Sequence, residues 1–279
     1  MKGSRILAVL RGPVHGPFSV KTQPGFTQIA VLCFMVLYAP MLPLVIYSFN
    51  AGTSLAIWEG LSLRWYVSAW NNALVQEATF RSLYLAASAS VIATVLATMA
   101  ALGTTRTGRY RGLTAIYAMI NQPLMVPEIV TAVALLIVFA VIREATGYHG
   151  MTYLIIAHTA FCIPFAYLPI RARLESMDLT LEAAAADLYA TPWRAFRRVT
   201  LPLLWPGILA GLMLAFVISL DDVVITELVK SPGQDTLPTY MLGLLRRVIT
   251  PEVYAISTVL LAVSVVVVTI SFFLNRKRR

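Results

Sequence analysis

The sequence predicts an all-α polytopic membrane protein with six transmembrane helices. Of its 279 residues, 58% are hydrophobic and 13% are charged, whereas about 25% of the residues in soluble domains are charged. The mean hydropathy is +0.76. A helix needs roughly 20 mostly apolar residues to cross a bilayer core about 30 Å thick. Six stretches meet that need: Phe26–Phe49, Ser82–Leu102, Leu113–Ile142, Met151–Ile170, Leu203–Val229 and Val253–Leu274.

The chain before the first stretch is expected to be a cytoplasmic tail rather than a cleaved signal peptide. Its apolar run, Ile6–Leu10, is shorter than the roughly 7–15 residues of a signal's hydrophobic region. Arg11, His15 and Lys21 follow, with several Gly and Pro residues. We therefore assign 1–25 to this tail, 26–274 to one membrane domain and 275–279 to a basic cytoplasmic tail.

Two of the stretches have internal features that bear on their shape. The third contains Pro123 and Pro127. We interpret it as one long kinked helix, because division at the prolines would leave pieces too short to cross. The fifth begins with Gly207-x-x-x-Gly211, a spacing that allows another helix to approach closely.

The basic residues indicate which side of the membrane each loop faces. Sixteen of the 22 Lys and Arg residues lie in the termini and in the loops after the second and fourth stretches, and six lie elsewhere. Cytoplasmic loops carry an excess of Lys and Arg. Both termini and the loop 171–202 are therefore expected on the cytoplasmic side.

Motifs for catalysis, nucleotide binding and metal binding are missing from the sequence. No Gly-Lys dipeptide occurs, so there is no P-loop. His158, inside the fourth stretch, is interpreted as a hydrogen-bonding partner between helices. Cys33 and Cys162 stand alone in apolar runs, so neither a disulfide nor a zinc site is expected. We expect no enzyme activity, no cofactor and, with so little polar surface, no nucleic-acid binding despite the net charge of +9.

The loop 171–202 is expected to form two short helices. Four consecutive alanines favour a helix over Leu181–Leu188, and Glu182 lies near its start, where the macrodipole favours a carboxylate. Thr191 is a suitable cap for a second helix with Pro192 at its first position. The pair could dock another protein against its small alanines. Alternatively, it could lie on lipid headgroups, with Arg194, Arg197 and Arg198 binding phosphates.

The same segment resembles the EAA loop of ABC importer permeases. That loop reads Glu-Ala-Ala, three residues, Gly, and then about nine residues to a hydrophobic-x-Leu-Pro sequence. The resemblance extends over nearly the whole chain and is closest to the inner-membrane permeases of putrescine and other polyamine importers. It includes the segments 37–50, 123–131, 219–225 and 231–238. The loop positions that match in register are Ala184, Ala185, Asp187, Leu188, Ala190, Thr191, Pro192, Phe196, Val199, Leu201 and Pro202.

Two positions depart from the pattern of the EAA loop. The Glu of the pattern falls on Ala183, and Glu182 stands one position early. The Gly of the pattern falls on Tyr189. If that turn needs a positive φ, a bulky residue there costs of order 1 kcal/mol.

The resemblance implies a permease subunit in the bacterial inner membrane, with the fold of this importer class. It implies two ATP-hydrolysing subunits on the cytoplasmic face, a second permease subunit and an external solute-binding protein as partners. The cargo would be a polyamine, with thiamine, ferric iron or an opine-like compound as alternatives. A secondary transporter without an ATPase is a further alternative. The residues implied in ATPase coupling are Glu182, Ala183, Ala184, Ala185, Asp187, Leu188, Tyr189, Thr191 and Pro192.

Four carboxylates lie inside the expected spans and are candidates for the substrate path. They are Glu128, Asp221, Asp222 and Glu227. An ionisable residue at the centre of a span costs roughly 2.5–3.5 kcal/mol on insertion scales, so each should face a cavity or a partner. On one helix Asp221 and Asp222 would point about 100° apart, so one of them is expected to face the path. In the structural alternative, Asp221 or Asp222 pairs with an arginine of the partner subunit, or Glu227 lies at the outer interface.

Overall fold

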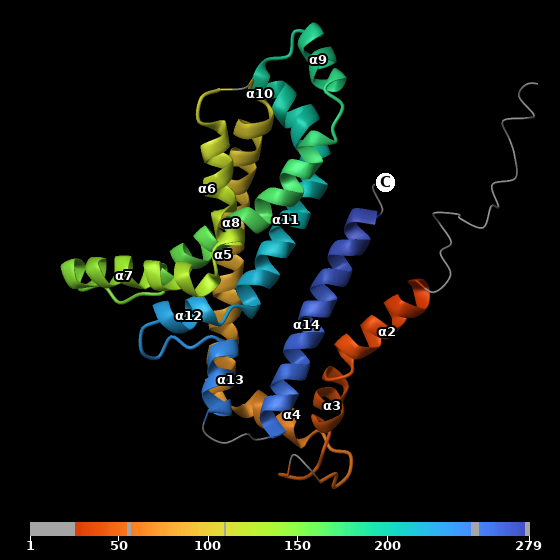
Figure 1. Cartoon of the computed structure of the whole chain (residues 1–279), viewed down its shortest axis with the longest axis vertical. Coiled ribbons are helices and arrows are strands. Elements are labelled where there is room, and N and C mark those ends of the chain that lie inside the picture. The colour runs from red at the N-terminus through yellow and green to blue at the C-terminus, as the bar shows by residue number, and fades with distance from the viewer. Residues whose placement is uncertain (1–25, 55–56, 109, 247–250, 277–279) are drawn as a thin grey trace, which may run out of the picture.

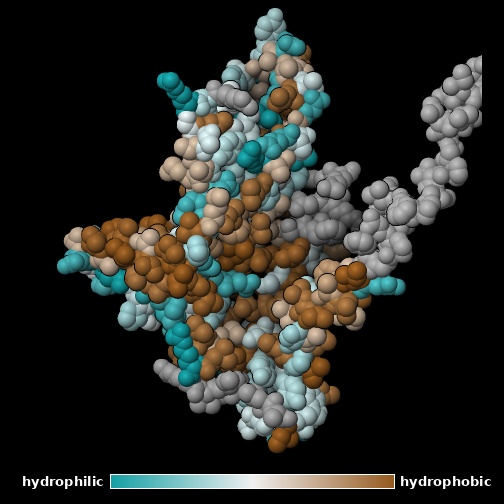
Figure 2. Space-filling view, viewed as in Figure 1, coloured by the Kyte–Doolittle hydropathy of each residue, from teal (hydrophilic) through white to brown (hydrophobic). Residues whose placement is uncertain are grey.

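The computed structural model describes the chain except for residues 1–25, 55–56, 109, 247–250 and 277–279. The assigned N-terminal tail and most of the C-terminal tail therefore lie outside the described residues. Within these limits the chain is helical, and an isolated antiparallel bridge joins Asn50 to Leu61. Figure 2 shows hydrophobic residues over the middle of the molecule and more polar residues toward its two ends. The all-α fold class is confirmed.

Five helical segments are long and apolar enough to cross a membrane. They are α5 (Ala73–Thr105), α7 (Glu128–Thr146), α8 (Thr152–Glu175), the continuous segment Pro192–Asp221 and α14 (Pro251–Arg276). A sixth span is possible by length and composition if α2 (Phe26–Tyr38) and α3 (Met41–Tyr47), bent by 44°, are taken together. The segment Pro192–Asp221 consists of α10 (Pro192–Ala195), a π-helical turn (Phe196–Thr200) and α11 (Leu201–Asp221).

Shorter helices lie at the two ends of the molecule and beside the bundle (Figure 1). The short helix α9 (Thr180–Asp187) lies with α10 at one end, and α4 (Arg64–Asn71) lies with α13 (Leu237–Leu245) near the other. Beside the bundle are α6 (Leu113–Met125) and α12 (Val224–Val229).

The core lies where α5, α8 and α11 pack against one another. Small side chains make this packing close, because Ala86, Ala89, Ala93, Ala97 and Ala101 of α5 are all fully buried. The expected close approach at Gly207 and Gly211 is confirmed. A Cβ at Gly211 would lie 2.7 Å from the Ala166 carbonyl oxygen. Larger residues at this position would push α11 away from α8.

The third stretch forms two helices, so the prediction of one long kinked helix was wrong. Val126 and Pro127 are extended, with ψ of 136° and 133°, between α6 and α7. Pro127 disfavours the helical conformation at Val126 and has no N–H to continue the ladder, so the chain breaks instead of bending. Figure 1 shows that α7 consequently runs sideways from the bundle.

The fifth stretch ends earlier than predicted. Asp222 is extended, with ψ of 133°, and α11 therefore stops at Asp221. The chain resumes as the six-residue helix α12. The prediction of a continuous span to Val229 was wrong for the same general reason as in the third stretch, because extended backbone interrupts the helical hydrogen bonds. Both breaks lie beside carboxylates that the sequence singled out.

Candidate functional site

The break after α11 is built around the carboxylate of Asp222, whose side chain is 1% exposed. One carboxylate oxygen accepts the N–H of Ile225 at 3.4 Å. The other accepts the backbone N–H of Thr226 at 2.9 Å and its hydroxyl at 2.8 Å. These are the first-turn N–H groups of α12, which have no partner inside the helix. Asp222 thus stabilises the start of α12, and its charge is satisfied locally.

His158 of α8 completes this buried network. Its ring is fully buried, with Nδ1 2.8 Å from the Ser219 hydroxyl and Nε2 2.9 Å from the Thr226 hydroxyl. Thr226 has one hydroxyl hydrogen, and it is directed at Asp222. Nε2 must therefore carry a hydrogen and donate to Thr226. The same nitrogen lies 3.3 Å from Asp222. His158 joins α8 to α11 and α12, as the sequence predicted.

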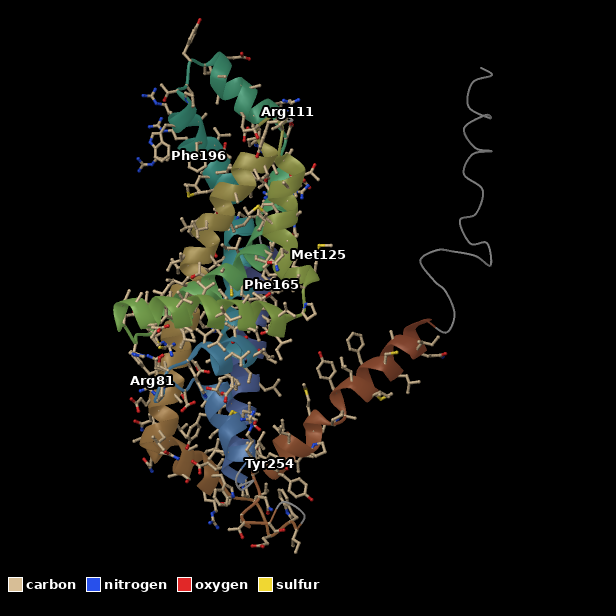
Figure 3. The ribbon with its side chains drawn as sticks, turned by 60° about the vertical axis from the view of Figure 1, so that its left-hand side comes forward. Arg81, Arg111, Met125, Phe165, Phe196 and Tyr254 are labelled. Carbon is tan, nitrogen blue, oxygen red and sulfur yellow. The ribbon has the colours of Figure 1, made fainter. Side chains whose placement is uncertain are left out.

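A cavity of about 410 Å³ opens beside the break. Its lining includes three carboxylates, from Glu128 at the start of α7 and from Asp221 and Asp222. Phe161 and Phe165 of α8 also line it, with ring centroids 5.4 Å apart. Phe165 is on α8 at about the level where α7 crosses the bundle (Figure 3). The remaining lining residues are Val217, Ile218, Val223 and Val224.

The two adjacent aspartates have different environments. Asp222 is buried in the network, whereas Asp221 is exposed toward the cavity. Among the described residues, Asp221 forms no hydrogen bond or ion pair, so its carboxylate is available to a ligand. The divergence expected for neighbours on one helix is therefore observed, although Asp222 lies beyond the helix end.

Glu227 is not part of this cavity. Its carboxylate lies 2.6 Å from Lys230 Nζ and 3.8 Å from the Arg246 guanidinium. Lys230 also contacts Asp235 at 2.6 Å. Burial alone would lower the pKa of Lys230, but hydrogen bonds to Asp235 and Glu227 outweigh it and raise the pKa. Glu227 thus belongs to an ion-pair cluster with Lys230 and Arg246.

The helices of the loop 171–202 form as the sequence predicts, within one residue at each end of α9. Asp178 accepts the Thr180 N–H at 2.9 Å before the first turn, and hydrogen bonds from Thr180 hold the pKa of Asp178 below its usual range. Thr191 caps α10 by accepting the Arg194 N–H at 3.4 Å, with Pro192 at the first position. Figure 1 shows this pair at the end of the molecule, beyond the bundle.

One side of α9 is held against its own chain. Glu182 accepts a hydrogen bond from the Thr200 hydroxyl at 3.0 Å and one from Arg106 Nε at 3.3 Å. Ala185 is half-buried on the same side. The exposed positions of the helix and the following turn are Thr180, Leu181, Ala183, Ala184, Ala186, Asp187, Leu188 and Tyr189.

Tyr189 occupies a left-handed turn, with φ of 57°. Among the described residues it is the non-glycine residue with positive φ. Its side chain is 94% exposed, so its contacts within the chain do not offset the backbone strain. The turn therefore has the geometry for which glycine is suited, although tyrosine stands there.

Sequence reasoning missed the aromatic wall of the cavity and the link between His158 and Asp222. His158 and Asp222 each indicated a polar contact within a span, but 64 residues separate them along the chain, so the sequence did not show that they meet. The pairing depends on how α8 packs against α11. Phe161 and Phe165 have the same apolar character as lipid-facing residues, so no local signal distinguished them.

Comparison with known proteins identifies the family. The family described as the inner membrane component of binding-protein-dependent transport systems matches residues 93–279. The chain belongs to this family. The permease is 39% identical over 258 residues to the putrescine transport system permease protein PotI of Escherichia coli K12, covering 91% of this chain and 92% of that one. It is 34% identical over 244 residues to the spermidine/putrescine permease PotC of Haemophilus influenzae, covering 88% and 93%.

Solved structures share the fold of the permease. A bacterial ABC transporter that imports the polysaccharide alginate matches with a TM-score of 0.68 at 18% identity, over 89% of this chain and 92% of that one. The inward-facing methionine transporter MetNI matches with a TM-score of 0.60 at 17% identity, over 73% and 95%. By its family and its relatives, the permease is a multi-pass inner-membrane transport component. The family match and the two relatives confirm the resemblance to the permeases of binding-protein-dependent importers.

Proposed function

We propose that the permease is a membrane-spanning subunit of an ATP-driven importer for polyamines, and that its cargo passes the cavity beside Asp221. The observation that carries this proposal is the meeting of carboxylates and aromatic rings at the break after α11. The names of the relatives PotI and PotC support a putrescine- or spermidine-like cargo. A polyamine is a chain of methylenes with ammonium groups, so it needs both negative charge and apolar contact.

Asp221 provides the free negative charge, and Glu128 lines the same cavity. An ammonium that loses water needs strong acceptors, and carboxylates supply charge-assisted hydrogen bonds. Phe161 and Phe165 provide the apolar wall, and aromatic faces also attract cations. Asp222 has a different role in this proposal. Its oxygens are already occupied by α12 and Thr226, so it positions the break and adds its charge to the field of the cavity.

The exposed side of α9 is the proposed contact with an ATP-hydrolysing subunit. The small side chains of Ala183 and Ala184 allow close approach, and the chain has no nucleotide-binding motif of its own. Glu182 ties the base of α9 to Arg106 and Thr200, so a displacement of α9 would be transmitted to α5 and α11. Two ATPase subunits, a second permease subunit and an external binding protein complete the proposed assembly.

The proposed orientation places both termini and the α9–α10 hairpin in the cytoplasm. It is supported by the excess of basic residues on that side. Single cysteines at Asn71 and Asp187, introduced after replacement of Cys33 and Cys162, test it in intact cells. An impermeant thiol reagent should label Asn71→Cys and spare Asp187→Cys. The reverse pattern would contradict the orientation.

Uptake by the complete transporter tests the function. Cells lacking their own polyamine importers would express the permease with its partner subunits and binding protein. We expect saturable uptake of labelled putrescine or spermidine that stops when the ATPase lysine of the partner is replaced. Uptake of thiamine or ferric iron instead of polyamines would overturn the cargo. Uptake that persists without an ATPase would indicate a secondary transporter.

A further inference from the structure

The short helix α4 has three distinct sides. The first side faces the protein, where Ala69 is buried and packs in a cluster with Val75, Leu237 and Ile256. Trp65 and Tyr66 flank it and are half-buried. Trp65 Nε1 donates to the Asn50 carbonyl at 3.0 Å. This side fixes the rotation of the helix about its axis.

The second and third sides are both exposed, but they differ in polarity. One exposes Leu63, Val67 and Trp70, whose exposed fractions are 60%, 57% and 78%. The other exposes Arg64, Ser68 and Asn71. At about 100° per residue, each set falls within a sector of roughly 60°, and the centres of the two sectors are about 100° apart. Apolar and polar residues are thus segregated on the free surface of α4, rather than mixed.

Hydrogen bonds tie α4 to the ends of two candidate spans. Near its start, the Tyr66 hydroxyl lies 2.7 Å from the hydroxyl of Ser48, the residue after α3. Beyond its end, the Asn72 side chain donates to Glu252 at 3.2 Å. Glu252 is the second residue of α14, in the first turn of the candidate span Pro251–Ile270. α4 is therefore held beside the ends of two candidate spans.

We propose that α4 is an interfacial helix that lies in the plane of the membrane surface. Its apolar side, Leu63, Val67 and Trp70, inserts among lipid acyl chains and glycerol groups, while Arg64, Ser68 and Asn71 face water. A helix at this depth meets lipid on one side and water on another, which is the segregation that α4 has. Tryptophan is enriched at this level because its ring is apolar and its N–H is polar. The occupant of the exposed apolar side is the lipid bilayer.

Spin labels with depth-dependent collision partners test this assignment. The complete transporter in proteoliposomes would carry single labelled cysteines at positions 67, 68, 70 and 71 in a background without Cys33 and Cys162. Oxygen concentrates in lipid, whereas a nickel chelate stays in water. Labels at 67 and 70 should collide several-fold more with oxygen than with the chelate, and labels at 68 and 71 should show the opposite preference. A label at the buried position 69 is the matched control and should be shielded from both.

Two results would overturn the proposal. Equal access of the chelate to all four exposed positions would place α4 in water. Shielding of positions 67 and 70 from both reagents would show that a protein covers this side, such as a partner subunit or the binding protein. The measurement requires no transported solute, so a result that contradicts the placement of α4 leaves the proposed function intact. Failure of polyamine uptake would likewise leave the placement of α4 unchanged.

Discussion

The α9–α10 hairpin and the break after α11 are both made of short helices, but they expose opposite chemistry. The hairpin presents alanine, leucine and aromatic side chains outside the bundle, where Tyr189 is 94% exposed. The break buries a histidine and a carboxylate inside the bundle, where His158 is fully buried. A surface of the first kind suits contact with another protein. A polar network of the second kind stabilises an irregular backbone and leaves one carboxylate, Asp221, for a ligand.

The comparison predicts that substitutions in the two regions cause different defects in the permease. Changes in the buried network should prevent the permease from folding, because buried polar groups lose their partners. Changes on the hairpin should leave a folded permease that no longer responds to ATP hydrolysis. The expected effects decrease from the centre of the network to the turn at Tyr189.

Asp222→Ala should have the largest effect on folding. It removes the acceptor of the Ile225 and Thr226 N–H groups and leaves the Thr226 hydroxyl hydrogen without its acceptor. Loss of a hydrogen-bonded buried carboxylate should reduce the free energy of unfolding by about 3 kcal/mol. The recovery of monodisperse permease in detergent and its melting temperature measure this. Asp221→Ala is the matched control, and equal losses in the two variants would contradict the assigned roles.

Ala184→Glu should abolish transport without affecting the fold. Ala184 is exposed on α9, so a larger charged side chain has room in the isolated permease but not in a close protein contact. Membrane insertion and melting temperature should stay unchanged while recovery of the ATPase subunit with the permease falls. Normal assembly and transport would move the contact surface elsewhere. We choose Ala184 rather than Ala185, because Ala185 is half-buried against its own chain.

Glu182→Gln should weaken coupling more than stability. The ion pair with Arg106 is partly exposed to solvent, so its loss should cost no more than about 1 kcal/mol. The uncharged side chain would hold α9 less firmly against Thr200 and Arg106. We expect ATP hydrolysis to continue with less solute transported per ATP. An unchanged ratio of transport to hydrolysis would show that this anchor plays no part in coupling.

Tyr189→Gly should have the smallest effect on stability, and it should stabilise the permease rather than destabilise it. Glycine adopts φ of 57° without steric cost, so the substitution relieves strain of order 1 kcal/mol. A small rise in melting temperature is the expected result. Tyr189→Asn should give part of that rise, because asparagine tolerates this conformation better than tyrosine. A fall in melting temperature in both variants would show that the tyrosine ring stabilises the turn.

The hairpin was predictable from sequence because its signals are local. The alanines, Thr191 and Pro192 act within a few residues, and the helices form where these signals place them. The breaks at Pro127 and Asp222 were harder to predict. The apolar composition continues through both, so hydropathy favours a continuous span. The carboxylates marked both places by their desolvation cost. Asp222 is compensated by hydrogen bonds from Ile225 and Thr226 and by the nearby His158 ring, which only the packing of α8 against α11 and α12 places there.

The most direct test of the central claim compares Asp221→Asn with Asp222→Asn in the complete transporter. Putrescine uptake and recovery of the assembled complex should be measured for both variants. Asp221→Asn should assemble normally and lose most of its uptake, because shape and hydrogen bonding are kept while the free charge in the cavity is lost. Asp222→Asn should lose assembly together with uptake, because the amide places a donor against the N–H groups of α12. Full uptake by Asp221→Asn would contradict the proposal that a cationic cargo passes this carboxylate.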